Sequence, residues 1–415
     1  MTERELDVFA DLEGVPVRAG RLWARTRGRK ESASFEYDDG WLVHRGAFAL
    51  DPMLPLGRGL FHTDQPLFNA FGDPAPDRWG QTLTRRNERA RAKAEGRTPR
   101  TLLAVDFLTL VDDATRLGAL RFRETSSGDA FLTSSGKTVP PLLELGRLLS
   151  ATSRIAANEE TDADLALVLA PGTSLGGARP KASVRDADGR LLIAKFPRKD
   201  DEWPLTRWEA TTLALAAHAK IDVCQARLQD VARRPVLLLA RFDRDGARRT
   251  PFMSALTLLG ATETEGHSYV EVAEALRREG AEVQRDLHEL WRRMVFNILV
   301  SNTDDHLRNH AFLRAAKGWR LSPAYDMNPM PVDVRPRVHA LALDETEGEA
   351  SLETALAVAP SFGLASVKDA RAIAREVGAA VSAWRTVGAK HGLKKRDLDR
   401  MESAFEHDDL RAARA

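Results

Sequence analysis

Apolar and polar residues alternate along the first part of the chain, a pattern that predicts short β-strands. In LDVFADLEGVPVRAGRLWA the alternation runs on both sides of the turn-prone pair Glu13-Gly14. It returns in SASFEYDDGWLV, just before Asp39-Gly40. The following stretch, FGDPAPDRWGQTLTRRNERARAKAEG, instead has a proline-rich entry and then the pattern of a polar helix ending near Gly96. We therefore expect a β-rich N-terminal part that carries one long polar helix.

The middle of the chain mixes both periodicities. Glycine, serine and threonine collect at Thr125 to Pro141, which is the best candidate for a linker, and helical spacing follows in LLELGRLLSATSRIAA. After the glycine-rich stretch PGTSLGGARP comes a predicted hairpin, in which KASVR and RLLIAKF flank a turn at Asp188-Gly189. A helix is expected from about Arg207 to Lys220, and a strand in RPVLLLARFDR.

From about Ser254 onward the chain is expected to be mainly helical. One segment has the three-and-four spacing of a core helix in Leu287, Leu290, Trp291, Met294, Val295 and Ile298. This segment runs directly into SNTDDHLRNHAF, from Ser301 to Phe312. The pattern thus predicts three segments, at 1–125, 126–243 and 244–415, which are β-rich, mixed and helical in turn.

Composition narrows the class of protein only modestly. The 415 residues include 61 lysines and arginines against 60 aspartates and glutamates, so no overall charge drives binding to nucleic acid or to a membrane. The basic clusters Arg25 to Lys30 and Arg85 to Arg97 are either solvated surfaces or contacts for DNA or an acidic partner. One cysteine excludes an internal disulfide, and the charged start has no signal-peptide core. We expect a cytoplasmic protein without a membrane partner.

The stretch from Ser301 to Phe312 carries the densest chemistry in the chain. A helix cap would need only one short polar residue. A metal hydrolase could use His306 and His310, four apart, with Asp304 or Asp305, but no second histidine cluster exists to complete the site. In phosphoryl transfer, one aspartate accepts a hydroxyl proton, an asparagine five residues later reaches Mg²⁺, and a separate aspartate bridges the metal to the phosphates. Asp304, Asn309 and the later Asp326 fit that order.

A phosphate-binding part is also present upstream. Gly172, Gly176 and Gly177 would allow backbone N–H groups to approach phosphate oxygens, although glycine-rich turns are common. Lys181 and Lys195 lie in the predicted hairpin. A lysine at a strand end usually points to solvent; in a phosphate site Lys195 would instead hold the nucleotide, oriented by a carboxylate such as that of Glu209. Lysine, glutamate, base, asparagine and metal aspartate then occur in protein-kinase order.

These residues resemble the HipA family, the serine/threonine-kinase toxins of bacterial toxin–antitoxin modules. The similarity rests on SLGGARPK, AKFP, LARFDR, NTDDHLRN and LSPAYDM, and more loosely on FGDPAPDRWG. It implies an α+β, bilobal, protein-kinase-like fold with an N-terminal β-rich subdomain and a mainly helical C-terminal lobe. On this basis 1–125 would be the subdomain, 126–243 the kinase N-lobe and 244–415 the C-lobe.

The resemblance also implies roles for individual residues. Asp304 would be the catalytic base, with Asp305 as a neighbour, and Asn309 and Asp326 would bind Mg²⁺. Ser174 would be autophosphorylated, and a phosphate there would repel those of ATP. Glu209, in a helix that matches the family poorly, would be the partner of Lys195. The ATP-binding set would be Lys195, Lys181, Gly176, Gly177, Ala240, Arg241, Phe242, His306 and Tyr325.

The implied activity is the transfer of the ATP γ-phosphate to a serine or threonine of a translation component, such as glutamyl-tRNA synthetase. The implied partner is a small helix-turn-helix antitoxin, HipB-like, through which operator DNA would be contacted indirectly. Two alternatives stay open at this point. One is a kinase of small molecules such as lipids or sugars, and the other is an inactive corepressor with a kinase fold.

Overall fold

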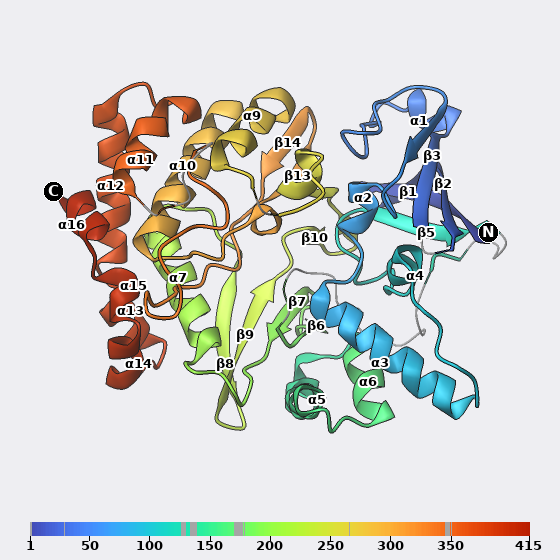
Figure 1. Cartoon of the computed structure of the whole chain (residues 1–415), viewed down its shortest axis with the longest axis horizontal. Coiled ribbons are helices and arrows are strands. Elements are labelled where there is room, and N and C mark those ends of the chain that lie inside the picture. Colours follow the sequence, from blue (N-terminus) through green and yellow to red (C-terminus); the bar gives the residue numbers. More distant parts are fainter. Residues whose placement is uncertain are drawn as a thin grey trace. The chain divides into compact units, whose positions relative to one another are not determined.

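The computed structural model describes residues 2–28, 30–125, 130–132, 139–169, 177, 179–264, 266–344, 349 and 351–415. Within them the chain forms two compact units, and each is described by itself (Figure 1). Unit 1 comprises Met1–Arg198 and Asp243–Met253, and unit 2 comprises Lys199–Phe242 and Ser254–Ala415. This division differs from the three expected segments, because the hairpin expected in the kinase N-lobe belongs to the N-terminal unit.

An antiparallel sheet of five strands, in the order β4-β3-β2-β1-β5, dominates unit 1. Its strands are β1 (Thr2–Leu12), β2 (Val15–Arg27), β3 (Lys30–Tyr37), β4 (Leu60–Thr63) and β5 (Leu120–Glu124). The predicted turn is confirmed: Glu13 and Gly14 have φ values of 53° and 89°, the left-handed pair that a two-residue hairpin needs. Leu6, Val8 and Phe122 are fully buried on one face of the sheet, which explains the alternating pattern.

The remaining elements of unit 1 are short, except for two helices. The predicted polar helix is α3 (Arg78–Ala94), which begins at the N-cap Asp77 and is followed by Gly96 at φ 65°. The predicted hairpin is β6 (Lys181–Arg185) paired with β7 (Leu191–Lys195), with Gly189 at φ 80° in the turn. The other bounds are α1 (Asp39–Leu42), α2 (Asn69–Gly72), α4 (Ala104–Thr109), η1 (Leu142–Glu144), α5 (Leu145–Ala157), α6 (Asp162–Leu169), β10 (Arg244–Asp245) and β11 (Arg248–Arg249).

Unit 2 is mainly helical, as the periodicity predicts. Its central element is α10 (Val283–Leu299), which contacts α9 (Tyr269–Glu279), α11 (Leu352–Val358) and α12 (Val367–Val381) (Figure 1). All six apolar residues expected to face the core are at most 4% exposed. The other bounds are α7 (Leu205–His218), β8 (Ala226–Val231), β9 (Arg234–Ala240), α8 (Ala255–Leu258), η2 (Leu307–Asn309), β13 (Ala311–Ala315), β14 (Gly318–Leu321), η3 (Ala359–Phe362), α13 (Trp384–Lys390), α14 (Lys395–Arg400), α15 (Glu402–Phe405) and α16 (Asp408–Arg414), and β12 (Phe252–Ser254) lies at the unit boundary.

Three aromatic side chains tie the C-terminal helices of unit 2 to α7. The rings of Trp384 and Phe405 are stacked with their centroids 4.6 Å apart, and the ring of Trp208 lies 5.8 Å from that of Phe405. Large aromatic surfaces buried in this way contribute strongly to packing. The helix that carries Glu209 is therefore fixed against the last part of the chain. Within the described ranges, no helix has the length and apolarity needed to cross a bilayer.

Candidate active site

The buried helix α10 delivers the SNTDDHLRNHAF motif to a fixed position. The helix ends at Leu299 with Val300 as its C-cap, and Ser301, at φ 52°, turns the chain away from the helix axis. The Ser301 hydroxyl donates to the carbonyl of Ala404 at 2.8 Å, and the amide of Asn302 donates to the carbonyl of Asn297 at 2.9 Å. Because Ser301 and Asn302 are buried and hydrogen-bonded, the loop that follows begins from a rigidly held stretch of backbone.

Asp304 and Asp305 are neighbours in sequence but lie in opposite environments. The Asp304 side chain is 70% exposed and accepts from the Arg335 guanidinium at 3.0 Å. The Asp305 side chain is 4% exposed and accepts from His310 Nε2 at 2.8 Å and from the Tyr269 hydroxyl. Of the two carboxylates, only that of Asp304 is accessible to a substrate hydroxyl.

The surroundings of Asp305 keep its carboxylate ionised. Burial acts to raise the pKa of Asp305, but the neighbouring His310 and Tyr269 outweigh it and hold that pKa below its usual range. The pKa of Tyr269 is raised, by burial and by the Asp305 charge. A carboxylate that is 4% exposed and bonded to two buried side chains is far less accessible to a substrate than that of Asp304.

The alternative of a metal hydrolase finds no support in this geometry. His310, one of its two proposed histidine ligands, is 2% exposed and hydrogen-bonded to Asp305. His306, the other, begins the short turn η2, where its carbonyl accepts from the amide of Asn309 at 2.8 Å. Among the residues that the structure describes, no three His, Cys, Asp or Glu side chains gather as a metal site would require.

Asn309 presents an oxygen that suits a hard cation. Its side-chain nitrogen donates to the carbonyl of Asp304 at 3.3 Å. This bond fixes the side-chain amide of Asn309 and does not use the amide oxygen. Amide and carboxylate oxygens are the ligands that Mg²⁺ prefers. The donor set of Asn309 and Asp326 therefore fits the magnesium ion that the sequence predicts.

Asp326 is held in an unusual backbone conformation beside this loop. Its φ of 58° lies in the left-handed region, which few residues other than glycine, asparagine and aspartate adopt. The side-chain nitrogen of Asn328 donates to Asp326 Oδ1 at 3.2 Å, and the amide of Asn328 donates to Asn302 Oδ1 at 3.3 Å. Asn302 thus joins the segment of Asp326 to the loop of Asp304.

Tyr325 makes a second connection between these segments. Its hydroxyl donates to the carbonyl of Arg308 at 2.8 Å, and its ring centroid lies 5.7 Å from that of Phe242. Phe242 follows β9, where the amide of Ala240 donates to the carbonyl of Gln225 at 2.8 Å and Arg241 is 6% exposed. The structure therefore brings the predicted nucleotide-contacting residues Tyr325 and Phe242 together within unit 2.

The hairpin in unit 1 carries the two predicted phosphate-binding lysines. Lys181 and Lys195 are directly opposite each other in the β6–β7 register, so their side chains leave the same face. Lys181 is buried, with its ammonium paired to the carboxylate of Asp77 and 3.3 Å from the carbonyl of Gly177. The backbone carbonyl of Lys181 also accepts from Trp79 Nε1 at 3.1 Å. Lys181 thus has a structural partner that the sequence reasoning missed.

The structure describes some of the remaining predicted residues but not all of them. Gly177 has a φ of 107°, a conformation that favours glycine, whereas Ser174 and Gly176 lie outside the described residues. Glu209 is buried in α7 of unit 2, and Lys195 is half-buried in unit 1. The pairing of Lys195 with Glu209 therefore stays a prediction.

We expect Asp77→Ala to destabilise unit 1 strongly. Asp77 caps α3 through the amide of Gly80 and neutralises Lys181, and both side chains are at most 6% exposed. Removing one partner of a buried ion pair costs about 3–5 kcal/mol. Urea unfolding measures the change in the free energy of unfolding.

The matched control for Asp77→Ala is Asp39→Ala. The Asp39 side chain is 75% exposed and pairs with Arg58 at 3.0 Å, and exposed pairs contribute about 1 kcal/mol or less. Equal losses of stability in the two variants would contradict the assigned role of Asp77.

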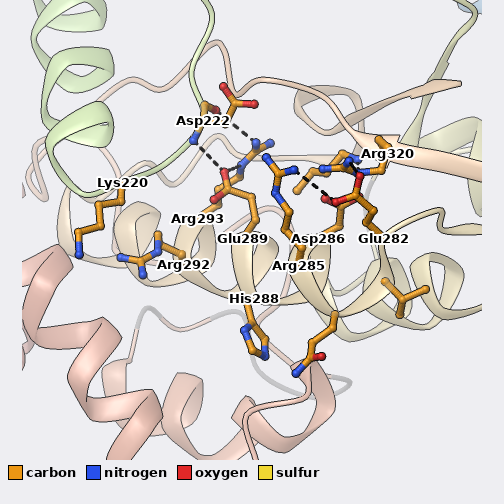
Figure 2. A pocket seen from close by; sticks show the side chains of 13 residues that line it. Lys220, Asp222, Glu282, Arg285, Asp286, His288, Glu289, Arg292, Arg293 and Arg320 are labelled. Carbon is orange, nitrogen blue, oxygen red and sulfur yellow. Dashed lines mark hydrogen bonds and ion pairs between the residues drawn. The ribbon is translucent and has the colours of Figure 1, made fainter. Parts of the chain in front are cut away.

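A pocket of about 790 Å³ opens beside α10 in unit 2, and it does not include the catalytic candidates (Figure 2). Its charges are largely matched within the protein, since Arg320 pairs with Asp286 at 2.8 Å and Arg293 pairs with Glu289 at 2.9 Å. Arg293 also donates to the carbonyl of Ser322 at 2.7 Å, just before the segment of Tyr325 and Asp326. A residue of the pocket wall thus holds the chain just before this segment. Because the charges that line the pocket are paired with one another, the pocket is a poor site for a nucleotide.

Comparisons with known proteins agree with the fold and with the motifs. A family model of the HipA-like C-terminal domain matches residues 173–384. The protein named "Putative kinase Y4mE" from Sinorhizobium fredii is 28% identical over 362 residues, covering 79% of this chain and 77% of its own length. A Haemophilus influenzae protein named "Putative kinase" is 25% identical over 211 residues. The match covers 44% of this chain and 61% of that protein.

A solved structure shows the same fold over nearly the whole chain. HipA of Shewanella oneidensis MR-1, determined in complex with HipB and operator DNA, superposes with a TM-score of 0.67 at 15% identity. The match covers 98% of this chain and 96% of that one. The predicted α+β, protein-kinase-like fold is thereby confirmed. With the family match over 173–384, the chain belongs to the HipA family of kinase-like proteins.

Proposed function

We propose that the chain is an ATP-dependent serine/threonine protein kinase. The observation that carries this proposal is that hydrogen bonds join two separate segments of unit 2. The exposed carboxylate of Asp304 lies in one loop with Asn309, and Tyr325 and Asn328 bond the segment of Asp326 to that loop. This arrangement would supply a base and two oxygen ligands from one rigid framework, as phosphoryl transfer requires.

The side chains of unit 2 would divide the work in the following way. Asp304 would accept the proton of the attacking hydroxyl and orient that hydroxyl toward the phosphate. Asn309 and Asp326 would hold Mg²⁺, which when bound neutralises phosphate charge. Arg335, in contact with Asp304, would keep the carboxylate in one rotamer until a substrate hydroxyl competes for its oxygen.

The nucleotide-binding residues that we propose are those implied by the sequence. Lys195 would hold the phosphates, with Glu209 as the partner that orients its ammonium. The backbone from Ala240 to Phe242 would contact adenine, with Tyr325 and His306 nearby, and Gly176 and Gly177 would let backbone N–H groups approach the phosphates. Lys181, which neutralises Asp77, would shape the end of the glycine loop.

The biological role that we propose is that of a toxin in a toxin–antitoxin module. The Shewanella oneidensis relative was solved with HipB and operator DNA, which supports a HipB-like helix-turn-helix antitoxin as partner. Contact with operator DNA would then be indirect, through the antitoxin. The phosphorylated substrate would be a cytoplasmic translation component, with glutamyl-tRNA synthetase as the first one to test. Ser174 would be autophosphorylated, and its phosphate would repel ATP from the loop.

The experiment that tests this proposal is phosphate transfer from γ-labelled ATP in a bacterial lysate. We expect labelled protein bands with the purified chain and Mg²⁺, and at least about 100-fold less label in the same time with Asp304→Asn. Mass spectrometry of the chain itself should map added phosphate to the peptide that contains Ser174. Label appearing only in small molecules would contradict protein-kinase activity, and phosphate mapping elsewhere would contradict the role of Ser174.

A further inference from the structure

Asp305 lies at one end of an unbroken line of hydrogen bonds that is buried as far as Asn302 and partly buried beyond it. Its carboxylate binds Tyr269 at the start of α9 and His310 at the end of the catalytic loop. Its backbone carbonyl accepts from the amide of Leu341 at 2.9 Å. The residue next to the proposed base is thus bonded to three separate parts of unit 2.

From Tyr269 the line continues toward the proposed metal site. Asn297 Nδ2 donates to the Tyr269 hydroxyl at 2.9 Å, and Asn302 Nδ2 donates to Asn297 Oδ1 at 3.1 Å. Asn302 Oδ1 then accepts from the amide of Asn328, whose side chain donates to Asp326 Oδ1. Tyr269, Asn297 and Asn302 are each at most 1% exposed.

The direction of these bonds is set by their chemistry. An ionised carboxylate can only accept, so Tyr269 must donate its hydroxyl proton to Asp305 and can only accept from Asn297. Asn297 therefore presents its nitrogen to Tyr269 and its oxygen to Asn302. Because each atom in the line can only donate or only accept, the charge of Asp305 determines the orientation of the side-chain amides of Asn297 and Asn302, as far as Asn328. A buried network of this kind tolerates one arrangement, since a group without its partner is costly there.

We propose that Asp305 is a positioning residue, which sets the geometry of Asp304 and Asn309 and, through Tyr269, Asn297 and Asn302, that of Asp326. This inference rests on the proposed kinase function for its kinetic consequence. The base and the metal aspartate come from segments more than twenty positions apart in the sequence. The network keeps the two in register while neither it nor Asp305 contacts the substrate.

The test uses Tyr269→Phe in the full-length chain, because it removes the one hydroxyl that joins Asp305 to Asn297. We expect kcat to fall by about 10- to 100-fold, since small displacements of reacting groups have effects of this size. The KM for ATP should change by less than about threefold, because residues outside the network bind the nucleotide. The Mg²⁺ concentration for half-maximal rate should rise.

Tyr37→Phe is the matched control. Tyr37 is 4% exposed, and its hydroxyl also makes two buried hydrogen bonds, to the carbonyl of Leu54 at 2.6 Å and from the amide of Leu50 at 3.0 Å. It lies in unit 1 and outside the network, so loss of its hydroxyl should lower stability without changing the Mg²⁺ dependence. A shift of equal size in both variants would show a general effect of destabilisation and overturn the proposal.

Amide hydrogen exchange separates this inference from the kinase proposal. In Tyr269→Phe the peptides covering 301–310 and 321–328 should exchange faster than in the wild type, and in Tyr37→Phe they should not. This readout holds even if no phosphotransfer is found, which would refute the kinase function alone. Unchanged exchange in 321–328 would refute the network as the link to Asp326.

A second variant covers the case in which Tyr269→Phe does not fold. Asn328 is only half-buried and ends the line, so Asn328→Ala should fold and lose only the bond to Asp326. We expect the same rise in the Mg²⁺ requirement and normal exchange in 301–310. Wild-type Mg²⁺ dependence in Asn328→Ala would contradict the proposed control of Asp326 by the network.

Discussion

Replacing Asp304 with asparagine should lower the rate of phosphate transfer by about 10²- to 10⁴-fold, the range typical for loss of a catalytic base. Asparagine has nearly the same shape but accepts no proton at neutral pH. The side chain is 70% exposed, so the fold should be unaffected. The initial rate with γ-labelled ATP and the unfolding midpoint, measured on the same preparation, check both parts of this expectation.

Asp333→Asn is the control for Asp304→Asn. The Asp333 side chain is 64% exposed and pairs with Arg400 at 3.0 Å, which matches the exposure and the arginine partner of Asp304. Among the described residues, its side chain is bonded to Arg400 and not to a proposed site residue, so the rate of this variant should equal that of the wild type. Equal rates in all three proteins would remove Asp304 from its proposed role.

Replacing Asp326 with asparagine should reduce the rate by about 10²- to 10³-fold, the loss typical when one preorganised electrostatic contact is removed. The left-handed backbone at φ 58° is one that asparagine also tolerates, so the change removes a charge without adding strain. Asn328 can still donate to the new amide oxygen. When the rate is measured against Mg²⁺ concentration at fixed ATP, the Mg²⁺ concentration for half-maximal rate should rise, because the metal has lost a carboxylate ligand.

The comparison variant for Asp326→Asn is Asp222→Asn. Asp222 lines the pocket beside α10. Its backbone carbonyl, which an asparagine keeps, accepts a hydrogen bond from the amide of Ala324 at 2.8 Å. We expect this variant to retain the wild-type Mg²⁺ dependence. A half-maximal Mg²⁺ concentration in Asp326→Asn that matches the wild type would contradict the assignment of Asp326 as a metal ligand.

The sequence predicts much of the fold because local patterns determine it. The Glu13-Gly14 turn and the hairpin from Lys181 to Lys195 follow from alternation and turn residues, and the structure confirms both. The core position of α10 follows from its helical spacing. The division into units was not predictable in the same way, since it depends on contacts such as that between Lys181 and Asp77, 104 positions apart.

The candidate site was predictable only as far as residue types and their order allow. Asp304 and Asp305 are chemically identical in the sequence, and only the fold shows that one is exposed and the other buried. Tyr269 and Arg335 have no motif to mark them, because each reaches the loop from a distant segment. Asn302 and Asn328 do lie within recognisable motifs, but their roles depend on a hydrogen bond that the sequence does not reveal.

The roles of Lys181 and Ser174 illustrate two further limits. Strand periodicity places Lys181 and Lys195 on one face of the hairpin, but it says nothing about which carboxylate meets each ammonium. The fold gives Lys181 the partner Asp77. Ser174 lies outside the described residues, so its role stays a prediction that phosphopeptide mapping must test.

The most direct test of the central claim is to locate a divalent ion by anomalous scattering in crystals grown with Mn²⁺ and a non-hydrolysable ATP analogue. The predicted result is a peak bound by the Asn309 amide oxygen and an Asp326 carboxylate oxygen, at about 2.1 Å for a hard octahedral cation. The Asp304 carboxylate should face the γ-phosphate without binding the metal. A peak elsewhere, or an ion held by His306 and His310, would contradict the kinase account.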